Sequence, residues 1–258
     1  MAYVQEKSVY VILVIDSETS GLSPDKNAIT QITAEAFRSD TLEPIGVFNK
    51  YVYPYKKRVI NPDKVKTTKS KRAVDATIEL ELMEYSPKAL QVTGITMEKL
   101  YEEGEQLDDV ATSFIKWIKD IEIPGVKTGK PLMCGYNFTF DVGFLLQMFE
   151  YTGTTEAASK LLLGDKFSSN GNTVWIPKFI DLMPLSRAIV NDRDDVPSTN
   201  LETIAGLFGI ENDDAHNALH DVEVTRQLLS VYIQKIRSEG GGEIEIKKGE
   251  KDRVHFRI

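Results

Sequence analysis

Two carboxylates follow the most apolar segment of the chain. Residues 9–15 read Val-Tyr-Val-Ile-Leu-Val-Ile, and Asp16 and Glu18 come directly after them. A short β-branched run of this kind is typical of a strand buried on both faces, and residues i and i+2 of a strand point to the same side. Asp16 and Glu18 would therefore present two anions together, and oxygen-only ligands favour a hard divalent cation such as Mg²⁺ or Mn²⁺. The alternative is that Asp16 opens a turn and Glu18 is solvated.

A third acid, Asp141, lies in the apolar segment 135–145. The short apolar strand expected at 131–135 is followed by Asn137, which can cap a helix over 138–151. Asp141 would then lie in the first turn of that helix, near the end of a strand. An acid at this position also has a purely structural interpretation, because it can simply pair with the helix dipole.

The segment Asp214-Ala-His-Asn-Ala-Leu-His-Asp221 precedes the last long helical pattern of the chain. If Asn217 caps that helix, Asp221 lies inside it and His216 stays in the preceding loop. The two side chains can then converge on one site, although a spacing of five would splay them on a continuous helix. The neighbouring His220 is expected to serve packing or the surface.

The elements that would position these residues follow from the hydrophobic pattern. Three strands joined by short turn-rich segments predict an antiparallel meander, and the strands and helices that alternate after it predict an α/β domain. The expected strands are 9–15, 29–37, 46–53, 131–135 and 173–180, and the expected helices are 106–120, 138–151, 182–190, 201–208 and 218–237. We therefore expect a mixed sheet, with antiparallel and parallel strands, flanked by helices.

Composition narrows the class of protein. The 258 residues include 41% hydrophobic residues, 17 Gly and a single Cys, which is ordinary for a globular chain and excludes a disulfide scaffold. The longest apolar run has seven residues and ends at Asp16, well short of the ~18 that cross a bilayer. No signal peptide is recognisable, so we expect no membrane partner and a cytoplasmic location.

Charge is unevenly distributed along the chain. The formal net charge is −8, yet residues 56–72 carry eight Lys or Arg and one Asp. This basic segment belongs to an expected insertion at about 56–85 within a domain that spans 1–238, and residues 239–258 are expected to form a Gly linker and a β-hairpin tail. The basic segment is either a solvated insertion or a binding site for a polyanion. Its candidate phosphate-binding residues are Lys56, Lys57, Arg58, Lys69, Lys71 and Arg72.

Three motifs in this order resemble the DEDDh 3′–5′ exonucleases. They are Asp-x-Glu-Thr-x-Gly-Leu from Asp16, Asn-x-x-Phe-Asp-x-x-Phe-Leu from Asn137 and His-Asn-Ala-Leu-x-Asp from His216. This superfamily includes replicase proofreading subunits, RNase T and oligoribonuclease, and it shares a ribonuclease H-like fold. The resemblance covers about residues 9–236.

The resemblance implies a catalytic site. Asp16, Glu18, Asp141 and Asp221 would hold two divalent ions, Mg²⁺ or Mn²⁺, and His216 would act as the general base that takes a proton from the attacking water. The reaction implied is release of 5′-mononucleotides from a 3′ end. Two departures from the pattern, Ser17 between the strand acids and Tyr136, stand outside these five positions.

Substrate contacts are expected around the same motifs. Thr19 and Leu22 resemble positions that contact the terminal nucleotide through backbone and apolar packing, Asn137 belongs to the same expected binding region, and Phe138 could stack on a base. The expected partner is single-stranded nucleic acid, with DNA favoured and RNA the close rival, in a bacterial or phage-infected cell. The alternative of a different class is a weakly active nucleic-acid-binding module of a replisome. A polymerase or replisome is a further candidate partner.

Overall fold

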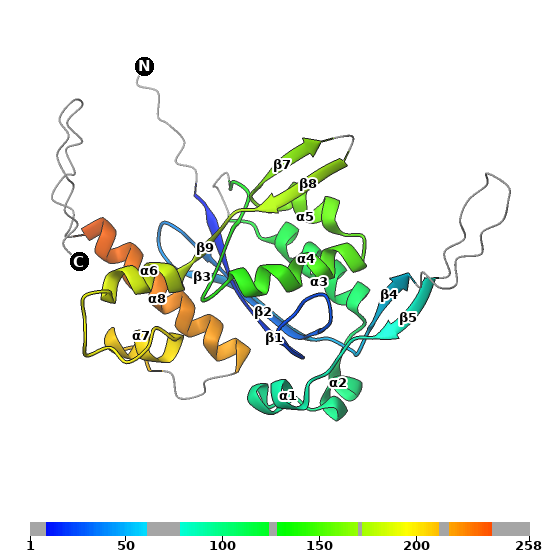
Figure 1. Ribbon diagram of the computed structural model, residues 1–258. Coiled ribbons are helices and arrows are strands. Elements are labelled where there is room, and N and C mark those ends of the chain that lie inside the picture. The colour runs from blue at the N-terminus through cyan, green and yellow to red at the C-terminus, as the bar shows by residue number, and fades with distance from the viewer. Residues whose placement is uncertain (1–8, 61–77, 124–127, 170–171, 212–216, 239–258) are drawn as a thin grey trace, which may run out of the picture.

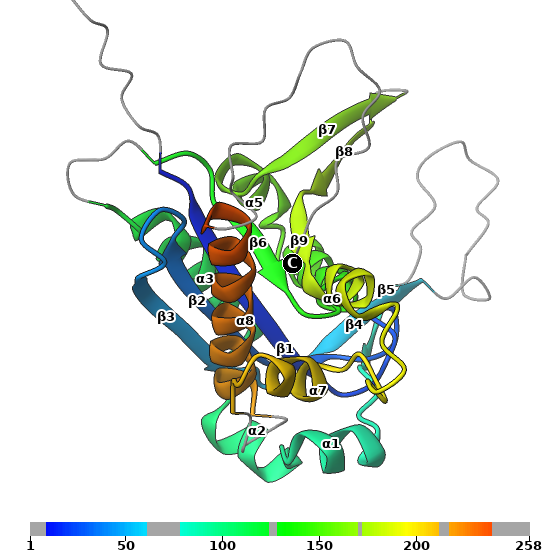
Figure 2. The same cartoon turned by 90° about the vertical axis from the view of Figure 1, so that its left-hand side faces the viewer.

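A five-stranded mixed sheet forms the centre of the molecule in the computed structural model, which describes residues 9–60, 78–123, 128–169, 172–211 and 217–238. The strand order is β3-β2-β1-β6-β9. The strands β1, β2 and β3 form an antiparallel meander, and β6 and β9 extend it in parallel (Figures 1 and 2). Their bounds are β1 Val11–Thr19, β2 Ile29–Arg38, β3 Pro44–Tyr51, β6 Leu132–Gly135 and β9 Phe179–Asp181.

Two hairpins lie outside this sheet. The strands β4 (Lys56–Ile60) and β5 (Ile78–Leu82) form one antiparallel pair, and β7 (Gly164–Ser169) and β8 (Asn172–Pro177) form the other. Both hairpins project away from the central sheet (Figure 1).

Helices cover both faces of the sheet. Figure 2 shows α8 lying along one face, and it packs against β1 and β2. The helices are α1 Pro87–Thr93, α2 Met97–Glu103, α3 Leu107–Asp120, α4 Thr139–Tyr151, α5 Thr155–Leu161, α6 Leu182–Val190, α7 Leu201–Leu207 and α8 Ala218–Ser238.

The alternation of β1 divides the core into two layers. Val11, Leu13 and Ile15 pack with the side chains of α3 and α4, whereas Ile12 and Val14 pack with those of α6, α7 and α8. Both sets are buried, as a strand between two helical layers requires. Continuing the same alternation, the side chains of residues 16 and 18 belong to the α8 side of the sheet and those of residues 17 and 19 to the α4 side.

The predicted α/β class and mixed sheet are confirmed. Apart from the end of β1, the meander, the strand at 131–135 and the helices expected at 106–120, 138–151, 182–190, 201–208 and 218–237 have counterparts within two residues at either end. β1 differs in length, because it continues to Thr19 and so includes both of its acids within the strand.

One predicted strand was wrong. Residues 173–180 were expected to form a single strand, but they divide between β8, which pairs only with β7, and the short β9, which pairs with β6. Pro177 ends β8, since proline cannot donate to a ladder. The helices α1, α2 and α5 were not predicted. Each has seven residues and at most one buried hydrophobic residue, so none shows a clear apolar face.

The expected capping role of Asn137 was also wrong. The N-cap position of α4 is Phe138, and Asn137 adopts a left-handed conformation with φ 57°. Asn tolerates this region better than most residues, so it forms the turn that leads from β6 into the helix. The first turn of α4 is instead bonded by Asp181, whose Oδ2 accepts hydrogen bonds from the Thr139 amide and hydroxyl at 3.3 Å.

No helix in the described part of the chain combines the length and the apolar character that a bilayer crossing needs. The predicted hairpin tail at 239–258 lies outside the described residues.

Candidate active site

Asp16 and Glu18 lie in the part of β1 that is no longer paired with β6. The parallel pairing of β1 with β6 ends at Val14–Cys134, whereas the antiparallel pairing with β2 continues through Asp16–Thr33 and Glu18–Gln31. Asp16 and Glu18 are partly exposed, and Ser17 between them is buried. The strand therefore presents two carboxylates on one face at an end that is open on the β6 side.

A third carboxylate reaches this end from α8. The helix begins at Ala218, and Asn217 caps it by accepting a hydrogen bond from the Leu219 amide at 3.2 Å, as predicted. This places Asp221 in the first turn. Carboxylate oxygens of Asp16, Glu18 and Asp221 lie within 4.8 Å of one another, so the predicted convergence of these three residues is confirmed.

Asp141 approaches the same strand from the α4 side. Its Oδ1 accepts hydrogen bonds from the Ser17 amide at 2.9 Å and from the Ser17 hydroxyl at 2.5 Å, and its side chain is almost fully buried. Its carboxylate lies beside the group of three rather than within it. The role of Ser17 was not predicted from the sequence. The available signal was a polar residue at a buried strand position, which requires a hydrogen-bonding partner.

Three of these acids, Asp16, Glu18 and Asp141, have a raised pKa, and burial is the largest cause for each. Burial and then the charges of Asp141, Glu18 and Asp221 hold the pKa of Asp16 well above its usual value. Burial, followed by the charges of Asp221 and Asp141, raises the pKa of Glu18 to about 8. Burial also raises the pKa of Asp141 to about 7, although the two hydrogen bonds from Ser17 act in the opposite direction.

These shifts make the donor set a good fit to a divalent cation. Without a counter-charge, several of the acids would hold protons near neutral pH, because clustered anions in a partly buried site repel one another. A cation relieves this repulsion, and three carboxylate oxygens close together are the hard ligands that Mg²⁺ and Mn²⁺ prefer.

The loop after β1 is firmly held and exposes an apolar side chain. Leu22 is 86% exposed, although it is a leucine. The amide of Gln147, a buried residue of α4, donates to the carbonyl oxygens of Pro24 and Asn27, and its Oε1 accepts from the Tyr55 hydroxyl. Leu22 is therefore presented to solvent by a fixed loop at the open end of β1.

Thr19, the last residue of β1, is turned inward. Its side chain is buried, and its hydroxyl donates to the Gly21 carbonyl at 2.7 Å. Any contact of Thr19 with a substrate would therefore involve its backbone, as expected.

Phe138 cannot stack on a base in this conformation, contrary to expectation. Its side chain is 0% exposed and lies edge-to-face against Phe179 with ring centroids 5.5 Å apart. A Cβ at Gly135 would meet the Phe138 ring at 2.3 Å, so glycine is required where β6 ends. Asn137 is exposed beside it.

The remaining predicted residues are only partly described. Lys56 is exposed on β4, and the Lys57 ammonium lies 4.0 Å from the Glu81 carboxylate across the hairpin. Arg58 lies on β4 opposite Leu80. His216, Lys69, Lys71 and Arg72 lie outside the described residues.

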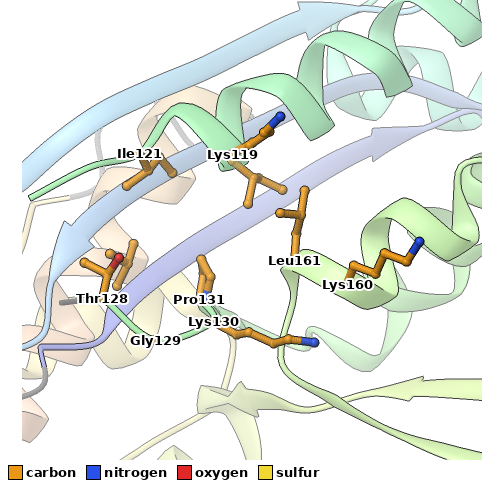
Figure 3. A pocket seen from close by; sticks show the side chains of 10 residues that line it. Lys119, Ile121, Thr128, Gly129, Lys130, Pro131, Lys160 and Leu161 are labelled. Carbon is orange, nitrogen blue, oxygen red and sulfur yellow. The ribbon is translucent and has the colours of Figure 1, made fainter.

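A separate pocket lies at the opposite end of β1 (Figure 3). It has a volume of about 230 Å³, and Val11, the first residue of the strand, is part of its lining together with three lysines. Two of these lysines are engaged, because Lys130 donates to the Ser159 carbonyl and Lys160 pairs with Glu156. Because the pocket lies at the opposite end of β1 from Asp16 and Glu18, it is distinct from the carboxylate site.

Comparison with known proteins identifies the family of the chain. Residues 72–229 match the sequence profile of the exonuclease family of RNase T type. Among curated proteins, the chain is 23% identical over 228 residues to DNA polymerase III PolC-type of Staphylococcus aureus, covering 88% of this chain and 12% of that protein. It is 24% identical over 155 residues to a putative bifunctional exonuclease/endonuclease protein of Mycobacterium tuberculosis, covering 60% of this chain and 19% of the relative.

The fold has solved counterparts as well. Exonuclease I of E. coli, in complex with a dT13 oligonucleotide, superposes with a TM-score of 0.58 at 21% identity, covering 90% of this chain and 42% of that one. The chain thus spans less than half the length of the proteins to which it is similar. Because the family profile matches more than half of the chain and the motifs occur in order, the chain belongs to the exonuclease family, within the DEDDh superfamily.

Proposed function

We propose that this chain is a metal-dependent 3′–5′ exonuclease that releases 5′-mononucleotides from single-stranded or frayed 3′ ends, with DNA as its main substrate. The observation that carries the proposal is the convergence of Asp16, Glu18 and Asp221 at the open end of β1. Membership of the exonuclease family supports the same chemistry.

The four acids would hold the ions that this chemistry uses. Asp16, Glu18 and Asp221 would offer oxygens to one ion, and Asp141 would help to hold a second. Two bound divalent ions, Mg²⁺ or Mn²⁺, supply the positive charge that stabilises a phosphodiester under attack. The protein contributes fixed ligand oxygens and a partly buried site in which that charge is weakly screened.

His216 would serve as the general base in this proposal. Its place in the His-Asn-Ala-Leu-x-Asp motif, five residues before Asp221, supports the assignment. An imidazole with a pKa near neutrality can accept the proton of the attacking water at physiological pH.

The terminal nucleotide would lie against the loop after β1. Leu22 offers an exposed apolar surface to a base or sugar, and Thr19 offers its backbone, while Asn137 is exposed at the start of α4. Farther from the acids, Lys56, Lys57 and Arg58 begin the basic segment that we propose guides the strand, together with Lys69, Lys71 and Arg72.

The preference for DNA rests on the relatives. A PolC-type DNA polymerase III contains a region similar to this chain, and exonuclease I of E. coli binds a dT13 oligonucleotide. The polymerase relative also supports a proofreading or repair role alongside a polymerase.

Matched oligonucleotides test this proposal. A single-stranded DNA and an RNA of the same sequence, each labelled at the 5′ end, are incubated with the protein and Mn²⁺ or Mg²⁺. We expect a ladder of shortened DNA products, 5′-mononucleotides as the released species and slower shortening of RNA. Faster shortening of RNA would reverse the substrate assignment, and intact substrates under all metal conditions would refute the exonuclease activity.

A further inference from the structure

The contact between Ser17 and Asp141 has a geometry that pairing within the sheet does not explain. The pairing of β1 with β6 ends at Val14–Cys134, so the Ser17 amide has no strand partner on the β6 side. It donates to Asp141 Oδ1 at 2.9 Å instead. A carboxylate from α4 thus takes the place of the missing strand at the edge of β1.

The hydroxyl of Ser17 adds a second bond to the same oxygen. Ser17 Oγ lies 2.5 Å from Asp141 Oδ1, and both side chains are buried, at 7% and 4% exposure. One oxygen of the carboxylate therefore accepts two short bonds, and this orients the other. An alanine at position 17 would keep the amide bond but would let the carboxylate rotate about it.

Ser17 also lies between the two acids of the strand. Asp16 and Glu18 belong to the group of three carboxylates, and Asp141 is outside it although its charge helps to raise the pKa of Asp16. Ser17 lies between these two strand acids, and both its amide and its hydroxyl donate hydrogen bonds to Asp141, the fourth acid of the site. The strand end and the start of α4 are consequently fixed relative to each other.

We propose that Ser17 is a positioning residue that orients Asp141 as a ligand for a second divalent ion. The inference rests on the proposed function, since it assumes that the acids bind metal. Groups that orient a metal ligand by hydrogen bonding commonly change metal affinity by about 10- to 100-fold when they are removed. Ser17 should therefore set the affinity of the ion near Asp141 and leave the ion held by Asp16, Glu18 and Asp221 largely unaffected.

Manganese binding to the full chain without nucleic acid tests this directly. Calorimetric or EPR titration of the wild type should resolve two classes of Mn²⁺ site. In Ser17→Ala we expect the weaker class to lose about tenfold in affinity and the tighter class to change less than about twofold. Ser17→Thr, which keeps the hydroxyl, should restore the weaker class.

Two controls separate positioning from a general loss of stability. Ser186 is also a buried serine, with hydrogen bonds to Leu182 and Tyr232. These two partners belong to the core layer on the α8 side of the sheet, away from Asp141. Ser186→Ala should lower the melting temperature without altering either class of Mn²⁺ site. In an Asp141→Asn background, Ser17→Ala should have no further effect on Mn²⁺ affinity.

The outcomes distinguish this inference from the proposed function. Unchanged Mn²⁺ binding in Ser17→Ala, or an equal loss of affinity in the Asp141→Asn background, would overturn the positioning role while the exonuclease proposal stood. A wild type that binds Mn²⁺ in one class would overturn the inference as well. Absence of oligonucleotide shortening by the wild type would instead overturn the proposed function.

Discussion

Arg226 of α8 donates from Nε to the carboxylate of Glu35 on β2 at 2.8 Å, and this ion pair fixes the helix that carries Asp221 against the sheet that carries Asp16 and Glu18. Only 18% of the Arg226 side chain and 11% of that of Glu35 are exposed. Glu35 has a raised pKa because it is buried, although the charge and hydrogen bond of Arg226 oppose the shift. The pair therefore affects both stability and the geometry of the site.

Breaking the pair should destabilise the fold. Glu35→Gln leaves the Arg226 guanidinium without its counter-charge, and a lost hydrogen bond to a charged group costs roughly 1.5–3 kcal/mol. Urea denaturation should show a loss of this size in the free energy of unfolding. The double variant Glu35→Gln/Arg226→Met should recover part of it, since no unpaired charge remains. A single variant as stable as the wild type would mean that the pair contributes nothing.

The raised pKa values predict an unusual dependence of stability on pH. An acid whose pKa is higher in the folded than in the unfolded state stabilises the fold most below its unfolded pKa, and this contribution is lost as the pH rises through its folded pKa. With a pKa of about 8 for Glu18 and about 7 for Asp141, the metal-free protein should lose stability between about pH 5 and 8.

Melting temperatures of the wild type and of Glu18→Gln in a chelator measure this effect. The variant cannot ionise at position 18, so its stability relative to the wild type should increase as the pH rises toward 8. Saturating Mn²⁺ should reduce the pH dependence of the wild type, because a bound cation stabilises the ionised carboxylates. A difference between the two proteins that does not vary with pH would contradict the raised pKa of Glu18.

The role of His216 predicts a separation between catalysis and metal binding. His216→Ala removes the base but leaves the carboxylates, so kcat should fall by about 10²- to 10⁴-fold. Mn²⁺ affinity, measured by titration without nucleic acid, should hardly change. His220→Ala is a matched control, as a histidine expected only to pack, and should keep most of the activity. A collapse of Mn²⁺ affinity in His216→Ala would make His216 a ligand rather than a base.

Most of the central fold could be predicted because its segments have clear periods. The buried run before Asp16 identified β1, and the spacing of Asn217 and Asp221 identified the start of α8. Residues 173–180 were predicted as one strand because most of them favour strands, but Pro177 ends β8, and the different pairing of β8 and β9 depends on tertiary contacts. The burial of Phe138 could not be predicted either, since an aromatic residue at the start of a helix can point into the core or toward solvent.

The hydrogen bonds that support the site could not be predicted from the sequence, because their partners are far apart along the chain. Ser17 and Asp141 are 124 positions apart, and Arg226 and Glu35 are 191 apart. Such bonds depend on how α4 and α8 cross the sheet, which no local pattern determines. The closeness of Asp16, Glu18 and Asp221 was predictable, because the types and order of these residues match a known family.

The basic segment should control the salt dependence of binding. Each phosphate contact with a single strand adds about 0.7 to the slope of log affinity against log salt concentration, because counterions are released. Changing Lys56, Lys57, Arg58, Lys69, Lys71 and Arg72 to Gln should flatten this slope and raise KM for long oligonucleotides. Cleavage of a dinucleotide should hardly change.

A control for this experiment changes lysines elsewhere. Lys116 and Lys160 are exposed and lie on α3 and α5, each paired with an acid one turn away. Their replacement by Gln should leave the salt slope as it is in the wild type. A basic-segment variant with an unaltered slope would show that these residues do not contact the nucleic-acid backbone.

The most direct test of the account is the activity of Asp16→Asn. This change keeps the volume of the side chain but removes a charge that lies among Glu18, Asp141 and Asp221. With a 5′-labelled single-stranded DNA and Mn²⁺, the wild type should shorten the strand progressively from its 3′ end. The variant, at an unchanged or higher melting temperature, should be slower by about 10³-fold or more. Near-normal shortening by Asp16→Asn would contradict the assignment of this carboxylate cluster as the metal-binding active site.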